Sequence, residues 1–157
     1  MKILKYEASE ERRVLSAMIL SDRVLARIAP KWESKGLFLS PWANLLGTLS
    51  VRFHKKHNSA PGKAIEGLFM AWAANKTDES VISLAENFLT SLDSDPSTIN
   101  PDYVIDLAGV YFSSVKKKKL SEALETYLLA GEQDKADELI RDYRKLELGT
   151  GSGVDLL

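Results

Sequence analysis

The sequence predicts an all-α fold: a small globular body of about five helices, then a long two-helix hairpin and a flexible C-terminal tail. Apolar residues recur at helical spacing along most of the 157 residues. No stretch shows the sustained alternation of apolar and polar residues that is typical of a strand. Residues 102–129 contain no proline, so a single helix can run through all of them.

The predicted globular body spans residues 1–95. Its first helix is expected to begin after Ser9, which two glutamates follow, and its second after Ser21, because serine is a preferred N-cap and acidic residues favour the first turn. Ser40 precedes a proline, which suits the first position of a third helix. Thr77 is expected to cap the fifth. The apolar residues expected to face the core are Val14, Leu15, Met18, Ile19, Val24, Leu25, Ile28, Trp42, Leu45, Leu46, Leu49, Phe53, Ile65, Leu68, Phe69, Trp72, Val81, Leu84, Ala85, Phe88 and Leu92.

The predicted hairpin arm spans residues 99–148, with a helix over 101–130, a tight turn and a shorter helix over 133–147. The long helix has two apolar stripes, and the second lies about 150° around the helix from the first. We therefore expect the first stripe to pack on the body and the second on the returning helix, leaving Phe112 and Leu129 poorly covered within one chain. The alternative is a long helix that breaks near its lysine run and folds back into an ordinary bundle. The stripes are Val104, Ala108, Tyr111 and Val115, and then Leu120, Leu124, Tyr127 and Leu128.

The order of these elements resembles the N-terminal domain of DnaB-type replicative helicases. The resemblance is carried by residues 10–30, 36–69 and, above all, 99–147. The sequence departs from the family at residues 76–80, where KTDES replaces the Gly-Gly turn that the family often has, as a divergent, phage-encoded member would. The positions that match the family pattern of the hairpin are Asn100, Tyr103, the run Lys116–Lys119 and Leu120.

The resemblance implies an assembly scaffold without catalysis of its own. In such helicases the hairpins pair, the dimers form a ring-shaped collar, and the collar receives primase or a helicase loader. The implied partners are therefore a second copy of this chain within a hexameric ring, primase or a loader, and DNA through the full-length protein, with no membrane. The implied location is cytoplasmic. ATP and Mg²⁺ belong to a separate motor domain, so we expect no cofactor in this chain.

Large apolar residues on the hairpin are the candidates for hairpin and dimer contacts, because such anchors typically dominate the energy of association. The predicted interface residues are Phe112, Val115, Leu120, Leu124, Leu128, Leu139, Ile140 and Tyr143.

The glycine-rich stretch GTGSG at residues 149–153 lacks the Lys-Ser/Thr of a phosphate-binding loop and has no strand before it. We therefore expect residues 149–157 to be a flexible linker toward a missing ATPase domain, and the chain to be a non-enzymatic part of an ATP-dependent DNA helicase. The absence of cysteine excludes disulfides and thiolate metal sites and fits an intracellular protein. No apolar run is long enough to span a bilayer. His54 and His57 lie beside cations, so no metal site is expected there.

Two basic clusters are weaker candidates for contact with a partner or with nucleic acid. The formal net charge of −1 gives the whole chain no strong field for nucleic acid. Four consecutive lysines point nearly all round a helix, so the run can be a solvated surface or a contact site. The rival to the scaffold hypothesis is a stand-alone all-α nucleic-acid-binding or helicase-loader protein. The clusters are Arg52, Lys55 and Lys56, and Lys116, Lys117, Lys118 and Lys119.

Overall fold

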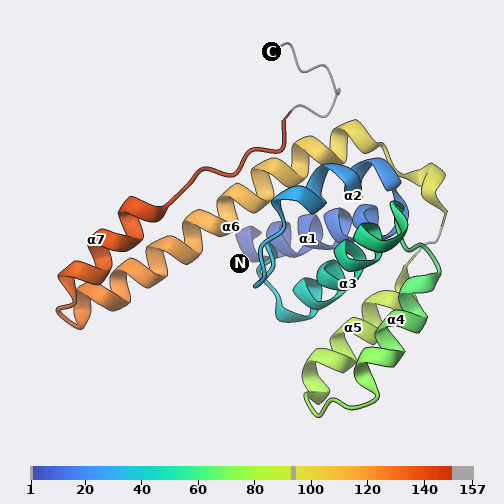
Figure 1. Ribbon diagram of the computed structural model, residues 1–157, viewed down its shortest axis with the longest axis horizontal. Coiled ribbons are helices and arrows are strands. Elements are labelled where there is room, and N and C mark those ends of the chain that lie inside the picture. The colour runs from blue at the N-terminus through green and yellow to red at the C-terminus, as the bar shows by residue number, and fades with distance from the viewer. Residues whose placement is uncertain (1, 93–94, 150–157) are drawn as a thin grey trace.

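The computed structural model describes residues 2–92 and 95–149, and all regular structure within these ranges is helical (Figure 1). The predicted all-α class is therefore confirmed. No described helix combines the length and the apolar content that crossing a bilayer requires. The α-helices are α1 (Lys2–Leu20), α2 (Asp22–Ile28), α3 (Pro41–His57), α4 (Ala64–Ala73), α5 (Glu79–Ser91), α6 (Pro101–Leu129) and α7 (Gln133–Asp142), and the 3₁₀ turns are η1 (Ala29–Lys31) and η2 (Pro96–Thr98).

Helix α1 contributes the centre of the core and packs against α2, α3 and α6. Its buried face comprises Val14, Leu15, Met18 and Ile19. The helix begins at Lys2, so the prediction that Ser9 caps it is wrong. No proline or glycine interrupts residues 2–8, and the helix simply continues through the serine.

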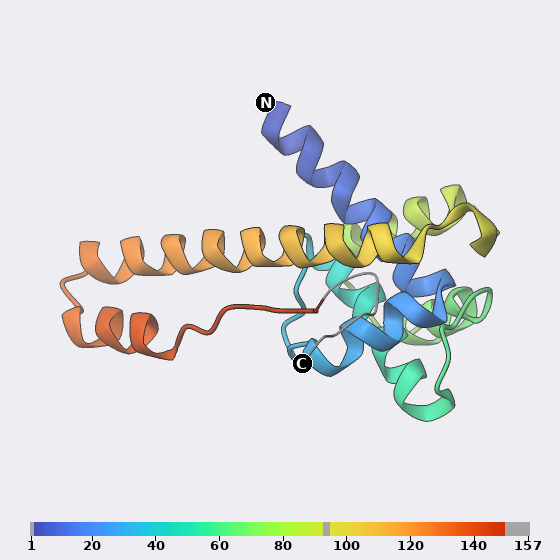
Figure 2. The ribbon, with the colours of Figure 1, turned by 90° about the horizontal axis from the view of Figure 1, so that it is seen from above.

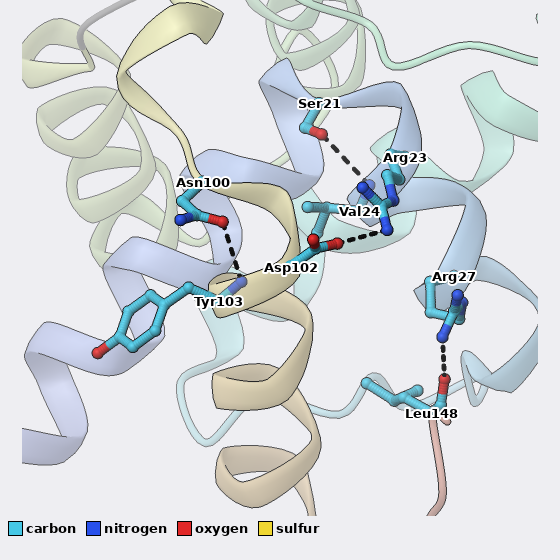
Figure 3. Close-up of polar contacts among 8 residues, drawn as sticks. All are labelled: Ser21, Arg23, Val24, Arg27, Asn100, Asp102, Tyr103 and Leu148. Atoms are coloured by element: carbon cyan, nitrogen blue, oxygen red, sulfur yellow. Dashed lines mark hydrogen bonds and ion pairs between the residues drawn. The ribbon is translucent and has the colours of Figure 1, made fainter. Parts of the chain in front are cut away.

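The other helix starts follow their capping residues more closely. The Ser21 side chain accepts a hydrogen bond from the Val24 amide at 3.3 Å, which confirms this cap (Figure 3). At α5 the prediction of Thr77 is wrong by one position, because the Asp78 carboxylate accepts from the Val81 amide at 3.3 Å. Aspartate ranks above threonine as an N-cap. Leu84 of the same helix, expected in the core, is 50% exposed, so this prediction is wrong.

A buried carboxylate joins α1, α6 and the segment before α3. Glu11 accepts hydrogen bonds from the Ser40 amide (2.9 Å), the Ser40 hydroxyl (2.7 Å) and the Tyr111 hydroxyl (2.9 Å). The Leu39 amide donates to the Tyr111 hydroxyl at 3.2 Å. These hydrogen bonds satisfy the buried carboxylate of Glu11 and the Tyr111 hydroxyl. They also hold the three segments together.

The loop between η1 and α3 lays aromatic side chains over α6. The ring centres of Phe38 and Phe112 are 5.1 Å apart, and those of Trp32 and Phe112 are 6.4 Å apart, both in edge-on geometry. Phe112 is consequently 0% exposed, so the prediction that it is poorly covered is wrong. Glycine at position 47 leaves room for the Trp32 ring, because a Cβ there would lie only 2.5 Å from Trp32 Cη2 and would clash with it.

Helix α6 is continuous over 29 residues, about 43 Å at 1.5 Å per residue, so the alternative of a break at the lysines is wrong. Asn100 caps it by accepting from the Tyr103 amide at 3.2 Å, and an Arg23–Asp102 ion pair joins its first turn to α2 (Figure 3). The predicted first stripe is buried, as expected. Beyond it, α6 extends past the other helices and α7 returns beside its end (Figure 2).

Helix α7 ends at Asp142, five residues before the predicted end at 147. Residues 143–149 instead run back toward α2 as an extended segment in which Leu146 and Leu148 are buried. Arg27 donates to the Leu148 carbonyl at 2.9 Å (Figure 3). Extended chain places alternate side chains on one face, so both leucines reach the core, which a continued helix would not allow. Of the predicted tail, residues 150–157 lie outside the described residues.

Candidate functional site

The candidate site is the distal half of α6, where an apolar stripe borders a shallow groove of about 430 Å³. All of the lining side chains come from α6 itself, at spacings of three and four residues, so they share one face of the helix. Helix α7 does not cover this face. The lining residues are Lys117, Leu120, Ser121, Leu124, Glu125, Leu128 and Leu129.

Helix α7 packs on the neighbouring side of α6. Its buried residue is Ala136, whose small side chain allows the two helices to approach closely. The Lys135 ammonium lies 5.9 Å from the centre of the Tyr127 ring. Successive residues on a helix point about 100° apart, so a helix beside Tyr127 leaves Leu128 on the open side. The predicted second stripe is therefore divided: the returning helix meets one side of it, and the groove exposes the other.

The eight predicted interface residues fall into two groups. Phe112 and Val115 are buried beneath the body, so this chain itself covers these two side chains. The reason is that aromatic residues of the loop before α3 reach α6, which helical periodicity alone does not reveal. Leu128 is 51% exposed and Ile140 is 59% exposed, and the remaining four are half-buried: Leu120, Leu124, Leu139 and Tyr143.

The lysine run does not form one basic face. Lys116 forms an ion pair with Glu33 at 3.6 Å, and its ammonium lies 5.6 Å from the Tyr143 ring centre. Lys119 donates to the Phe38 carbonyl at 3.1 Å. Lys117, by contrast, borders the apolar groove. Part of the run therefore holds α6 against its own chain, which reduces the charge available for nucleic acid.

The second basic cluster lies on the last turns of α3, where Arg52, Lys55 and Lys56 are exposed. Beside this cluster, His57 packs on the ring of Phe53, with 4.4 Å between ring centres. Within residues 2–92 and 95–149, no group of three or more His, Cys, Asp or Glu side chains is placed to hold a metal ion.

Sequence analysis missed a groove of about 500 Å³ between α1, the end of α5 and the start of α6. Arg12 lies there over the Phe88 ring, 5.3 Å from its centre, and donates to the Ser91 hydroxyl at 3.3 Å. Arg13 lies 5.9 Å from the ring centre of Tyr103. The only sequence signal is the adjacent pair of arginines, which is indistinguishable from an ordinary helix surface until α5 and α6 are placed beside α1.

Comparisons with models of protein families, with curated proteins and with solved structures found no match for this chain.

Proposed function

We propose that this chain is a non-catalytic assembly and partner-binding domain, similar to the N-terminal domain of DnaB-type replicative helicases. In this proposal residues 1–95 form the globular body, and residues 99–148 form an arm that pairs with the arm of a second copy. The supporting observation is the open apolar groove on distal α6, together with Leu129, which is 82% exposed at its end.

The lengths of the two arm helices explain why a second copy suits this surface. Helix α7 has ten residues and is about 15 Å long, whereas α6 is about 43 Å long. A helix this short covers only one side of the distal half of α6. Burying apolar surface stabilises an association by roughly 25 cal/mol per Å². A two-fold axis places the same groove on both sides of the interface, so each copy covers the leucines of the other.

The docking of primase or a helicase loader is proposed from the resemblance. In this proposal the paired arms build a collar, and the collar presents composite surfaces that a single copy lacks. The chain itself carries out no reaction, and ATP and Mg²⁺ act elsewhere in the full-length helicase. Contact with DNA likewise belongs to the assembled protein.

The rival function, a stand-alone nucleic-acid-binding or loader protein, depends on the two basic clusters. Lys116 and Lys119 are already held by Glu33 and by the Phe38 carbonyl, which weakens that hypothesis. Binding of single-stranded DNA by this chain alone, with an affinity that falls steeply as salt is raised, would favour the rival.

The test is the molar mass of wild-type, Leu128→Asp and Val110→Asp chains, measured by light scattering over a range of concentrations. Both residues are exposed on α6, with Val110 at 71%, but only Leu128 borders the groove. We expect the wild type to be a dimer or larger and Leu128→Asp to be a monomer, because an uncompensated carboxylate in an apolar interface is costly. Val110→Asp should keep the wild-type mass.

Circular dichroism of all three chains checks that the helices persist. A wild-type chain that stays monomeric at every concentration would contradict the proposal. So would a Leu128→Asp chain that assembles as the wild type does.

A further inference from the structure

We infer that a second groove, between α3 and α5, is a docking site for a short acidic, amphipathic segment of a partner protein. This groove measures about 320 Å³ and lies on the globular body, away from the hairpin. The inference does not rest on pairing of the arms. Its floor is formed by Leu45, Leu49 and Val81, its side by Trp72, and its rim by Lys35 and Arg52.

The groove has a mixed lining in which Asn44 and Thr48 lie beside the leucines of α3, and its apolar residues are only half covered by the protein itself. Leu45, Leu49 and Val81 pack against the core from one side and remain partly exposed on the other. Leu45, Leu49 and Arg52 are spaced by four and three residues, so α3 presents them on one face. A stripe of this kind, apolar at its centre with a cation at its end, suits an amphipathic helix that lies in the groove.

Trp72 lines one side of the groove. Its ring stacks on Phe69 with 6.2 Å between centres, and the Lys76 ammonium lies 5.7 Å from the ring centre. The indole N–H makes no hydrogen bond within residues 2–92 and 95–149. Tryptophan and arginine are the side chains most enriched among residues that dominate interface energies. The groove therefore combines aliphatic side chains with a tryptophan.

The groove is lined by two cations, Lys35 and Arg52, and by one carboxylate, Asp78, so its charged side chains carry a net positive charge. Lys35 and Arg52 form no ion pair within the described part of the chain. The carboxylate that lines the groove, Asp78, is engaged at the start of α5, where it accepts from the Val81 amide and from the Ser80 hydroxyl at 3.0 Å. The unpaired cations thus favour a partner that carries acidic residues, and such complementarity also raises the rate of encounter.

A peptide fits this groove better than a nucleic acid does. Its floor is aliphatic, whereas proteins that bind single strands present aromatic rings on which bases stack. The Trp72 ring already has contacts with Phe69 and Lys76. The volume suits a few side chains of a short helix and is close to the lower limit for binding pockets.

The test begins with selection from a displayed library of random peptides about 16 residues long, which is long enough for an amphipathic helix. The wild-type chain is the bait, and peptides that also bind the Arg52→Glu/Val81→Arg chain are removed. We expect enriched sequences with two or three large apolar residues at helical spacing and several Asp or Glu. No enrichment, or enrichment of neutral or basic sequences, would overturn the inference.

The best enriched peptide is then measured by fluorescence anisotropy. Replacing its acidic residues by amides should weaken binding by about tenfold or more, and Arg52→Gln should weaken it by about fivefold to tenfold, because charge-assisted hydrogen bonds are lost. Lys145→Gln, which removes an exposed cation elsewhere, should change nothing. Equal losses in Arg52→Gln and Lys145→Gln would refute a specific site. Oligothymidylate that binds tighter than the peptide, in a manner sensitive to Arg52→Gln, would assign the groove to nucleic acid.

Discussion

The two halves of α6 belong to one unbroken helix but lie in different environments. In the proximal half, Val104, Ile105, Ala108, Tyr111, Phe112 and Val115 are all buried by α1, α2 and the loop before α3. In the distal half, α7 is the neighbouring helix, and the leucines after Lys119 remain half-exposed or more. The proximal half is therefore anchored by tertiary packing, whereas the distal half retains exposed apolar surface.

This difference shows why the apolar content of a helix does not by itself reveal what it binds. Both halves carry large apolar residues at helical spacing. The apolar residues of the proximal half meet aromatic side chains from a distant part of the sequence, such as Phe38 and Trp32. Substitutions in the two halves should consequently affect different properties: the free energy of unfolding in one and self-association in the other.

The largest expected effect on unfolding is that of Phe112→Ala. The substitution removes a wholly buried ring that touches Trp32 and Phe38. We expect it to lower the free energy of unfolding by about 3–5 kcal/mol, through lost transfer energy and the cavity it leaves. Leu129→Ala, in the distal half, should change the free energy of unfolding of the monomer by less than about 0.5 kcal/mol. Urea denaturation at a concentration where the chain is monomeric measures both, and similar losses would show that the halves do not differ.

A smaller effect is expected where α6 meets the buried carboxylate. Tyr111→Phe removes the hydroxyl that donates to Glu11 and accepts from the Leu39 amide. Leaving these groups unsatisfied should cost about 1–3 kcal/mol of unfolding free energy. The control is Tyr103→Phe, because Tyr103 is 52% exposed. This substitution should leave the free energy of unfolding almost unchanged. If the two variants lose equal stability in urea, the Glu11 network does not join the segments as described.

The smallest effect concerns Gly109, within the proximal half of α6. An added Cβ there would meet no atom within 4 Å. Gly109→Ala should therefore raise the free energy of unfolding by about 0.5–1 kcal/mol, because alanine loses less conformational entropy in a helix. Gly47→Ala should instead destabilise the protein, since its Cβ would press on Trp32. Thermal unfolding of both chains checks the opposite signs, and a destabilised Gly109→Ala chain would mean that this side of α6 is covered.

Local signals in the sequence predicted much of this fold. Ser21 caps its helix as serine commonly does, and the proline-free residues 102–129 lie in one helix. The tight turn predicted between the two helices of the hairpin is also present, and Gly131 within it has a φ of 74°. These features depend on a few neighbouring residues, so a single sequence contains enough information to place them.

Features that depend on distant contacts could not be predicted in the same way. The burial of Phe112 requires knowing where the loop carrying Phe38 lies, and a loop has no periodicity to reveal its position. The residues after Asp142 continue the helical spacing of apolar residues, so the pattern predicts a helix where the structure has an extended segment. The alternation of Leu146, Glu147 and Leu148 is typical of extended chain, but three residues are too few to predict it against the helical pattern of the preceding residues. Only the burial of both leucines in the core shows the extended conformation.

The most direct test of the central claim, that distal α6 pairs with a second copy, is hydrogen exchange measured at about 5 µM and about 200 µM protein. Association slows hydrogen exchange of the amides that the complex keeps from opening, so exchange at the interface becomes slower as the protein concentration rises. We predict slower exchange at the higher concentration for residues 120–129 and unchanged exchange for residues 104–115. Equal exchange at both concentrations in the distal half, with the chain monomeric throughout, would contradict the claim.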